Sequence, residues 1–150
     1  MTAPTGDVGT PGDDGTPADD RRPRRRRISS GGPWEATAGY SRAIVVGDSC
    51  WVAGTTDAGP DGVSRHPGDV TAQARAVFAI IERALAEGGF RLDDVVRTRM
   101  FVRDMADSAA LSAVHGEVFA DIRPAATMVA VAGLMDPSLL VEIEAEARRS

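Results

Sequence analysis

The sequence predicts one α+β domain, with two helices packed on one face of a mixed β-sheet. Three observations lead to this class. A chain of 150 residues has the length of a single domain of ordinary size. Its 43% hydrophobic and 26% charged residues are typical of a globular protein. From residue 28 onward, strand-like and helix-like segments follow one another in the order β-β-α-β-α-β-β, and helices that connect strands are typical of a two-layer arrangement.

The first hairpin and the first helix have clear local patterns. Residues 43–46 and 50–53 are mainly apolar and flank a Gly-Asp-Ser turn, which predicts a β-hairpin. Asp69 can cap a helix, and Gly88 and Gly89 can end it. Apolar residues recur in this helix at three- and four-residue steps, which predicts one buried stripe. The stripe consists of Ala76, Val77, Ile80, Ile81, Ala84 and Leu85.

A third strand and a second helix follow. Residues 95–103 alternate, which predicts a strand with three arginines on one face. Its other face carries Val96, Thr98, Met100 and Val102. Ser108 can cap the second helix, and Pro124 follows its end. The buried stripe predicted for this helix is Leu111, Val114, Val118 and Phe119.

Two strands at residues 127–134 and 139–147 complete the predicted sheet. In the last strand, Glu142, Glu144 and Glu146 share one face, and the apolar residues between them face the other way. Residues 127–134 are apolar on both faces, although a two-layer domain leaves one sheet face without helices. We therefore expect another copy of the chain to cover that face.

Residues 1–27 form a predicted tail ahead of the domain, which spans residues 28–150. Residues 1–20 nearly lack large apolar side chains and are predicted to be disordered. Six arginines between residues 21 and 27 indicate either an anionic partner or, as we favour, a solvated linker. Subtracting these arginines and the tail's five aspartates from the chain's 17 basic and 22 acidic residues leaves 11 and 17. A domain with a net charge of −6 is a poor nucleic-acid binder.

The residue inventory excludes several kinds of chemistry. A single cysteine, Cys50, forms neither an internal disulfide nor a structural zinc site. All 17 basic residues are arginine, so no lysine Schiff base or phosphate-loop lysine is available. No nucleotide-binding motif follows a strand, and we expect no cofactor. No apolar run is long enough for a membrane span or a secretion signal, so we expect a cytoplasmic protein.

Two titratable residues are the first candidates for a reactive site. His115 lies at the edge of the second helix's apolar stripe, where it can be a proton carrier or a structural histidine bonded to the backbone. Three carboxylates on one strand face repel each other, which favours a solvated face for Glu144 and Glu146. For Glu142, the sequence favours neither a position in a cleft nor a position on a solvated face.

Several segments together resemble the Rid family of reactive intermediate deaminases, over about residues 28–150. They are GYSRAIVVGDSCWVAGTT, DVTAQARAVFAIIERALAEGGFRLDDVVRTRMFVRDMAD, HGEVFADIRPAATMV and LVEIEAEA. The resemblance implies a chorismate-mutase-like fold and a homotrimer with three clefts between subunits. It also implies cofactor-independent hydrolysis of imines, in which a bound water attacks and ammonia leaves.

Site residues carry over unevenly. By resemblance, Tyr40 is the cleft tyrosine, Gly54 is the backbone that approaches the ligand, and Glu142 is the glutamate linked to the attacking water. The cleft lining departs from the family pattern at Thr55, Ser112 and Met128. His115 is an additional candidate for this lining.

The main departure is Ala126, which stands where deaminating members carry the arginine that holds a substrate carboxylate. Arg123 is an alternative source of that charge. The resemblance to the arginine-lacking branch thus implies a trimer that binds small imine, enamine or carbonyl metabolites but is inefficient on 2-imino acids. The competing hypothesis is a non-catalytic metabolite-binding or chaperone-like trimer.

Overall fold

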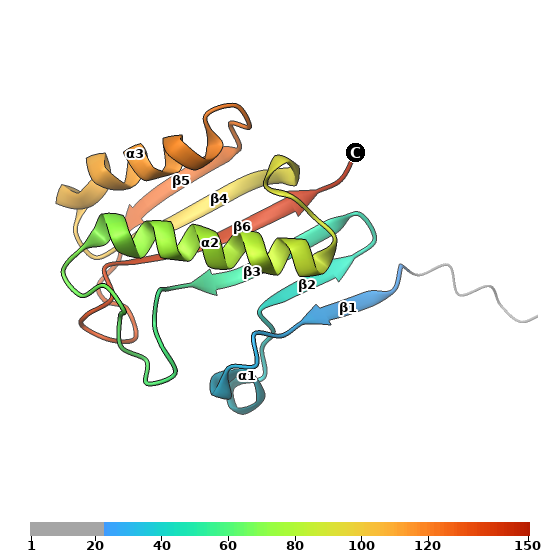
Figure 1. The fold of residues 1–150 in the computed structure, drawn as a ribbon, viewed down its shortest axis with the longest axis horizontal. Helices are drawn as coiled ribbons and strands as arrows, with labels where there is room; N and C mark the ends of the chain where they lie inside the picture. The colour runs from blue at the N-terminus through green and yellow to red at the C-terminus, as the bar shows by residue number, and fades with distance from the viewer. Residues whose placement is uncertain (1–22) are drawn as a thin grey trace, which may run out of the picture.

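The computed structural model describes residues 23–150, and the predictions made for residues 1–22 lie outside that range. Its fold is the predicted α+β class (Figure 1). The helices are α1 Pro33–Ala38, α2 Val70–Gly88 and α3 Ser108–Phe119. The strands are β1 Arg25–Ile28, β2 Ala43–Val46, β3 Ser49–Thr55, β4 Val95–Val102, β5 Ala125–Ala130 and β6 Val141–Arg148. Short 3-10 turns at Leu92–Asp94 and Met105–Asp107 precede β4 and α3.

The strands form one mixed sheet in the order β1-β2-β3-β6-β4-β5. Only β4 and β5 pair in parallel within it, and α3 connects them, as a parallel pair requires a long crossover. Helices α2 and α3 lie side by side over one face of the sheet (Figure 1). We call the opposite side, which carries Trp51, Arg99 and the three glutamates of β6, the open face.

The core lies between the sheet and the two long helices. Asp69 caps α2 as predicted, because its carboxylate accepts a hydrogen bond from the amide of Ala72 at 2.9 Å. Four of the six predicted stripe positions of α2 are buried, and the other two are partly exposed. Alternation along β6 buries Val141, Ile143, Ala145 and Ala147 and leaves the glutamates on the open face.

The folded part begins earlier than the predicted boundary at residue 28. Arg25–Ile28 form β1, which pairs with β2 and buries Ile28. Arg26 donates hydrogen bonds to the carbonyls of Glu87 at 2.9 Å and Gly88 at 2.7 Å, at the end of α2. Part of the arginine run therefore belongs to the sheet. The sequence did not predict this strand, because consecutive arginines show no alternation of apolar and polar residues.

Two further expectations for the sheet were wrong in detail. The register between β4 and β6 shifts between Val95 and Arg97, so Val95 is buried while Val96 is 48% exposed. Such a bulge exchanges the faces of neighbouring residues. Strand β5 covers residues 125–130 instead of 127–134, because its partner β4 ends at Val102. No helix within residues 23–150 is long and apolar enough to cross a bilayer.

Candidate functional site

Three of the predicted site residues lie on or beside the open face, and two of them, Gly54 and Glu142, are in contact. Tyr40 follows α1, Gly54 lies near the end of β3, and Glu142 is the second residue of β6. The short helix α1 is anchored by Glu35, whose carboxylate accepts hydrogen bonds from the Ser29 hydroxyl at 2.6 Å and the Ser30 amide at 2.7 Å. The helix ends at Gly39, whose φ of 70° turns the chain toward Tyr40.

Glycine at position 54 makes room for the Glu142 side chain. A Cβ atom at this position would lie 2.0 Å from Oε1 of Glu142 and 3.0 Å from its Cδ. The pairing between β3 and β6 also shifts register between Val52 and Thr55, which is typical of a β-bulge. The carboxylate of Glu142 thus lies directly against the bulged backbone, in space that any other residue would fill.

The environment of Glu142 alters its proton affinity. Burial raises the pKa of its carboxyl above the ordinary value, Arg42 opposes the rise, and Glu144 adds to it. A carboxylate with a raised pKa is a stronger base than an exposed glutamate. Because it is half-buried and has a raised pKa, it has the properties required of a group that orients or deprotonates water.

Arg42 is a member of this site that sequence reasoning missed. Its Nη2 donates to the carbonyl oxygens of Ala53 at 2.7 Å and Gly54 at 2.8 Å. Burial lowers the pKa of its guanidinium, while Tyr40, Glu35 and Glu142 act in the opposite direction. The available signal was weak: an arginine directly before a buried strand, inside the segment GYSRAIVV.

The other predicted site residues lie on or near α3 and β5. His115 is wedged between Phe78 and Phe119, and its Nε2 lies 2.9 Å from Oγ1 of Thr98. Burial lowers the pKa of His115. These contacts favour a structural role for this histidine, although its partner is the Thr98 hydroxyl and not the predicted backbone group. Ser112 is exposed on α3.

Ala126 and Met128 belong to the helix-covered face of the edge strand β5. Ala126 is in register with the buried Thr98, and Met128 is in register with the buried Met100. Register partners in neighbouring strands point to the same side of a sheet. Within one chain, both residues are therefore on the opposite face from Glu142.

Thr55 and Arg123 are placed differently from what the sequence led us to expect. Thr55 is fully buried, and its hydroxyl donates to the carbonyl of Ala53 at 2.8 Å, so it is not exposed to a ligand. Arg123 has a φ of 51°, and its Nε donates to the carbonyl of Ala120 at 3.0 Å at the end of α3. Its side chain is thus directed back to the helix.

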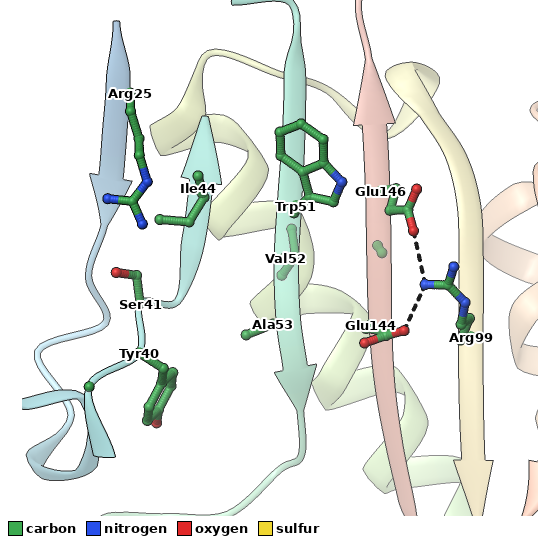
Figure 2. Close-up of a pocket in the computed structure, with 12 residues that line it drawn as sticks. Arg25, Tyr40, Ser41, Ile44, Trp51, Val52, Ala53, Arg99, Glu144 and Glu146 are labelled. Atoms are coloured by element: carbon green, nitrogen blue, oxygen red, sulfur yellow. Dashed lines mark hydrogen bonds and ion pairs between the residues drawn. The ribbon is translucent and has the colours of Figure 1, made fainter. Parts of the chain in front are cut away.

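A hollow of about 370 Å³ lies on the open face beside this site (Figure 2). Tyr40 lies on one side of it, Trp51 of β3 lies in the middle, and the carboxylates of Glu144 and Glu146 on the neighbouring strand β6 lie on the other side (Figure 2). Nη1 of Arg99 contacts both carboxylates, at 2.8 and 2.9 Å. The hollow includes Tyr40 but not Glu142, and its two glutamates share the single positive charge of Arg99.

A buried polar cluster holds the loops that follow β3 and precede β6. Oδ2 of Asp57 accepts from the hydroxyl of Ser64 at 2.9 Å and lies 3.0 Å from Nδ1 of His66. The buried Gln73 donates to the carbonyls of His66 and Ser138 and accepts from the amide of Leu140. These contacts fix the ends of both site-bearing strands. Within residues 23–150, no group of three or more His, Cys, Asp or Glu side chains could hold a metal ion.

Residues 32–149 match the family model described as Endoribonuclease L-PSP. The chain belongs to this family. A crystal structure of a member of the YjgF/YER057c/UK114 family from Mycobacterium tuberculosis superposes with a TM-score of 0.77 at 43% identity, covering 84% of this chain and 100% of that one. Another solved structure, a Rid-family protein from Yersinia pestis, has a TM-score of 0.73 at 27% identity over 84% of this chain and 100% of that one. These matches confirm the resemblance to the Rid family.

The relatives include a protein that is named as a deaminase. The chain is 36% identical to the 3-aminoacrylate deaminase RutC of Acinetobacter baylyi, over 71% of this chain and 83% of that protein. The family thus contains at least one protein named as a deaminase of an enamine-type acid.

Proposed function

We propose that the protein is a homotrimer that binds small imine, enamine or carbonyl metabolites in clefts between subunits. In this proposal it acts as a cofactor-independent hydrolase of imines, with Glu142 directing the water. The observation that carries the proposal is the half-buried Glu142 carboxylate seated on the Gly54 bulge, with a raised pKa. The deaminase name of the RutC relative supports the reaction class.

The proposed cleft needs more than one chain. Tyr40, Gly54 and Glu142 are on the open face, whereas Ala126 and Met128 are on the helix-covered side of edge strand β5. A cleft that contains both groups must therefore be shared between two subunits. The open face also exposes 45% of Trp51, a large apolar side chain that another subunit would cover.

The proposed reaction consumes one water and releases one ammonia. Glu142 accepts a proton from water while the water oxygen bonds to the carbon of the C=N group, and the carboxyl then gives this proton to the imine nitrogen. In the resulting amino alcohol, the ionised carboxylate takes the hydroxyl proton and passes it to the amino group. The C–N bond then breaks, ammonia leaves, and a carbonyl product remains. Every step is a proton transfer or a polar addition, so no cofactor is required.

Substrates without a carboxylate suit this site better than 2-imino acids. Ala126 offers no cation to a substrate carboxylate. Loss of a charge-assisted bidentate contact costs about 1.5–3 kcal/mol, which is roughly ten- to a hundred-fold in affinity. Arg123 donates to the end of α3, which argues against its taking over this role. The missing cation at position 126 also favours the second candidate, a trimer that binds metabolites without turning them over.

Ammonia release from freshly generated imines, with and without a carboxylate, tests the proposal. We expect turnover of neutral imines by the wild type and its loss in Glu142→Gln. Glu146→Gln is the matched control, because its carboxylate is on the same strand face but contacts Arg99. Ala126→Arg should improve activity on 2-imino acids.

Two results would contradict this proposal. No turnover by the wild type or by Ala126→Arg, together with saturable binding of the carbonyl product, would establish the non-catalytic candidate. A light-scattering mass equal to one 15.7 kDa chain would exclude the shared cleft.

A further inference from the structure

Arg42 projects from the open face next to the proposed catalytic carboxylate. It lies one residue before β2, and its carbonyl accepts from the amide of Ala53 at 3.0 Å, so it stands opposite Ala53 in the hairpin. Its neighbour Ala43 is buried beneath the helices. Because strand residues alternate, the Arg42 side chain is on the side of the sheet that carries Glu142.

The guanidinium of Arg42 binds the bulge on which Glu142 rests. The ladder between β3 and β6 breaks between Val52 and Thr55, which leaves carbonyls of the bulge available to other donors. Nη2 of Arg42 donates to two of them, on Ala53 and Gly54. Hydrogen bonds from a charged donor are among the stronger ones in proteins. The bulge is thus held in place by a side chain of the neighbouring strand.

Arg42 also acts on Glu142 electrostatically. Within the described residues, these two side chains form no ion pair, yet the charge of Arg42 opposes the rise that burial causes in the pKa of Glu142. Nε of Arg42 is buried without a hydrogen-bond partner. A guanidinium kept partly out of water and close to a carboxylate interacts more strongly with it than an exposed one would.

We propose that Arg42 is the positioning residue for Glu142: it fixes the bulge beneath the carboxylate and supplies the positive charge beside it. This inference rests on the proposed function for its catalytic meaning, although its two physical parts can be measured without any substrate. In the hydrolysis, Arg42 touches neither water nor imine. It keeps Glu142 in the ionised form that accepts a proton, and it keeps the carboxylate over Gly54.

A titration of the Glu142 carboxyl by carbon-13 NMR tests the charge. The signal is assigned by its absence in Glu142→Gln. In Arg42→Gln we expect the titration midpoint to rise by at least about half a pH unit. Arg75→Gln is the matched control, since Arg75 pairs with Glu117 on the exposed side of α2, and we expect no change. An unchanged Glu142 midpoint in folded Arg42→Gln overturns the proposal and leaves Arg42 a purely structural residue.

Arg42→Lys tests the contact with the bulge, and it serves as the test variant if Arg42→Gln does not fold. Lysine keeps the charge, but its side chain is one atom shorter and its ammonium does not reach the position of Nη2, which donates to both carbonyls. We expect the Glu142 midpoint to stay near that of the wild type, while amide exchange at Gly54 and Thr55 becomes at least about tenfold faster. Unchanged exchange at both amides refutes the positioning role.

Activity separates this inference from the proposed function. If the wild type turns over imines, the acid limb of the kcat profile should move to higher pH in Arg42→Gln, together with the NMR midpoint. If the wild type has no activity, the proposed function fails, and the NMR titration still decides whether Arg42 sets the charge of Glu142.

Discussion

Replacing Gly54 with alanine is the most direct way to move the proposed catalytic carboxylate without changing its chemistry. The added Cβ would lie 2.0 Å from Oε1 of Glu142, whereas ordinary contact begins at 3.4 Å. The carboxylate oxygen must therefore move by about 1.4 Å, the difference between these distances. Displacements of about 1 Å can reduce a reaction rate by roughly a hundred-fold.

The same substitution should have little effect on stability. Gly54 is not among the residues with a positive φ, so alanine fits its backbone conformation. Alanine reduces the entropy of the unfolded chain and stabilises by about 0.4–1 kcal/mol. Moving Glu142 away from its preferred rotamer costs about 0.5–1.5 kcal/mol. We expect the free energy of unfolding to change by less than about 1 kcal/mol.

Three measurements on Gly54→Ala check this reasoning. Urea denaturation gives the stability, imine hydrolysis gives the rate, and the NMR titration of Glu142 gives its pKa, which should fall toward its ordinary value as the carboxylate leaves its buried position. Gly116→Ala is the control, because no atom lies within 4 Å of the added Cβ and it is on α3. It should stabilise by about 1 kcal/mol, as alanine does in helices, without altering the site. A Gly54→Ala protein with wild-type turnover and an unchanged Glu142 titration would refute the reasoning.

Two residues away from the open face, His115 and Gln73, yield predictions about stability. Burial lowers the pKa of His115, so the unfolded chain binds this proton more tightly than the folded chain. The stability contributed by neutral His115 is complete above about pH 6.5 and is lost as the pH falls through the lowered folded value. His115→Gln should reduce this pH dependence in thermal melts, and an unaltered dependence contradicts the assignment. Gln73→Leu removes the partners of three backbone groups at about 1–3 kcal/mol each, so the free energy of unfolding should fall by about 3 kcal/mol or more. A loss below about 1 kcal/mol in urea denaturation would show that water replaces the amide.

The sequence predicted the layers of the fold because each long element carries its own periodicity. Helix α2 has a cap at Asp69 and a stripe of apolar residues, and β6 alternates without interruption. Strand β1 has no such pattern, since three of its four residues are arginines. It forms a strand because it pairs with the edge of β2, because Ile28 is buried in the core, and because Arg26 donates to a carbonyl at the end of α2. Contacts of this kind do not appear in local sequence.

The site was predictable only where a residue's role depends on its type and motif. The stretch around Gly54 and the strand of Glu142 resemble a family pattern, and the structure places these two residues in contact. The same reasoning assigned Thr55 to the cleft, because it did not foresee that the bulge turns this residue into the core. Arg42 was missed for a related reason. Its importance depends on where the β3 carbonyls point, and that is decided by the bulge.

The contacts of Arg42 and Arg123 argue against either of them supplying the positive charge that is missing at Ala126. Nη2 of Arg42 already donates to two carbonyls, so the pair of N–H groups needed for a bidentate carboxylate contact is incomplete. Arg123 donates to the end of α3. Arg42 and Glu142 together carry no net formal charge, so a neutral imine is not repelled. A substrate carboxylate is repelled by Glu142, and neither Arg42 nor Arg123 is available to pair with it. Adding an arginine at position 126 should therefore change which substrates bind more than it changes how Glu142 acts on them.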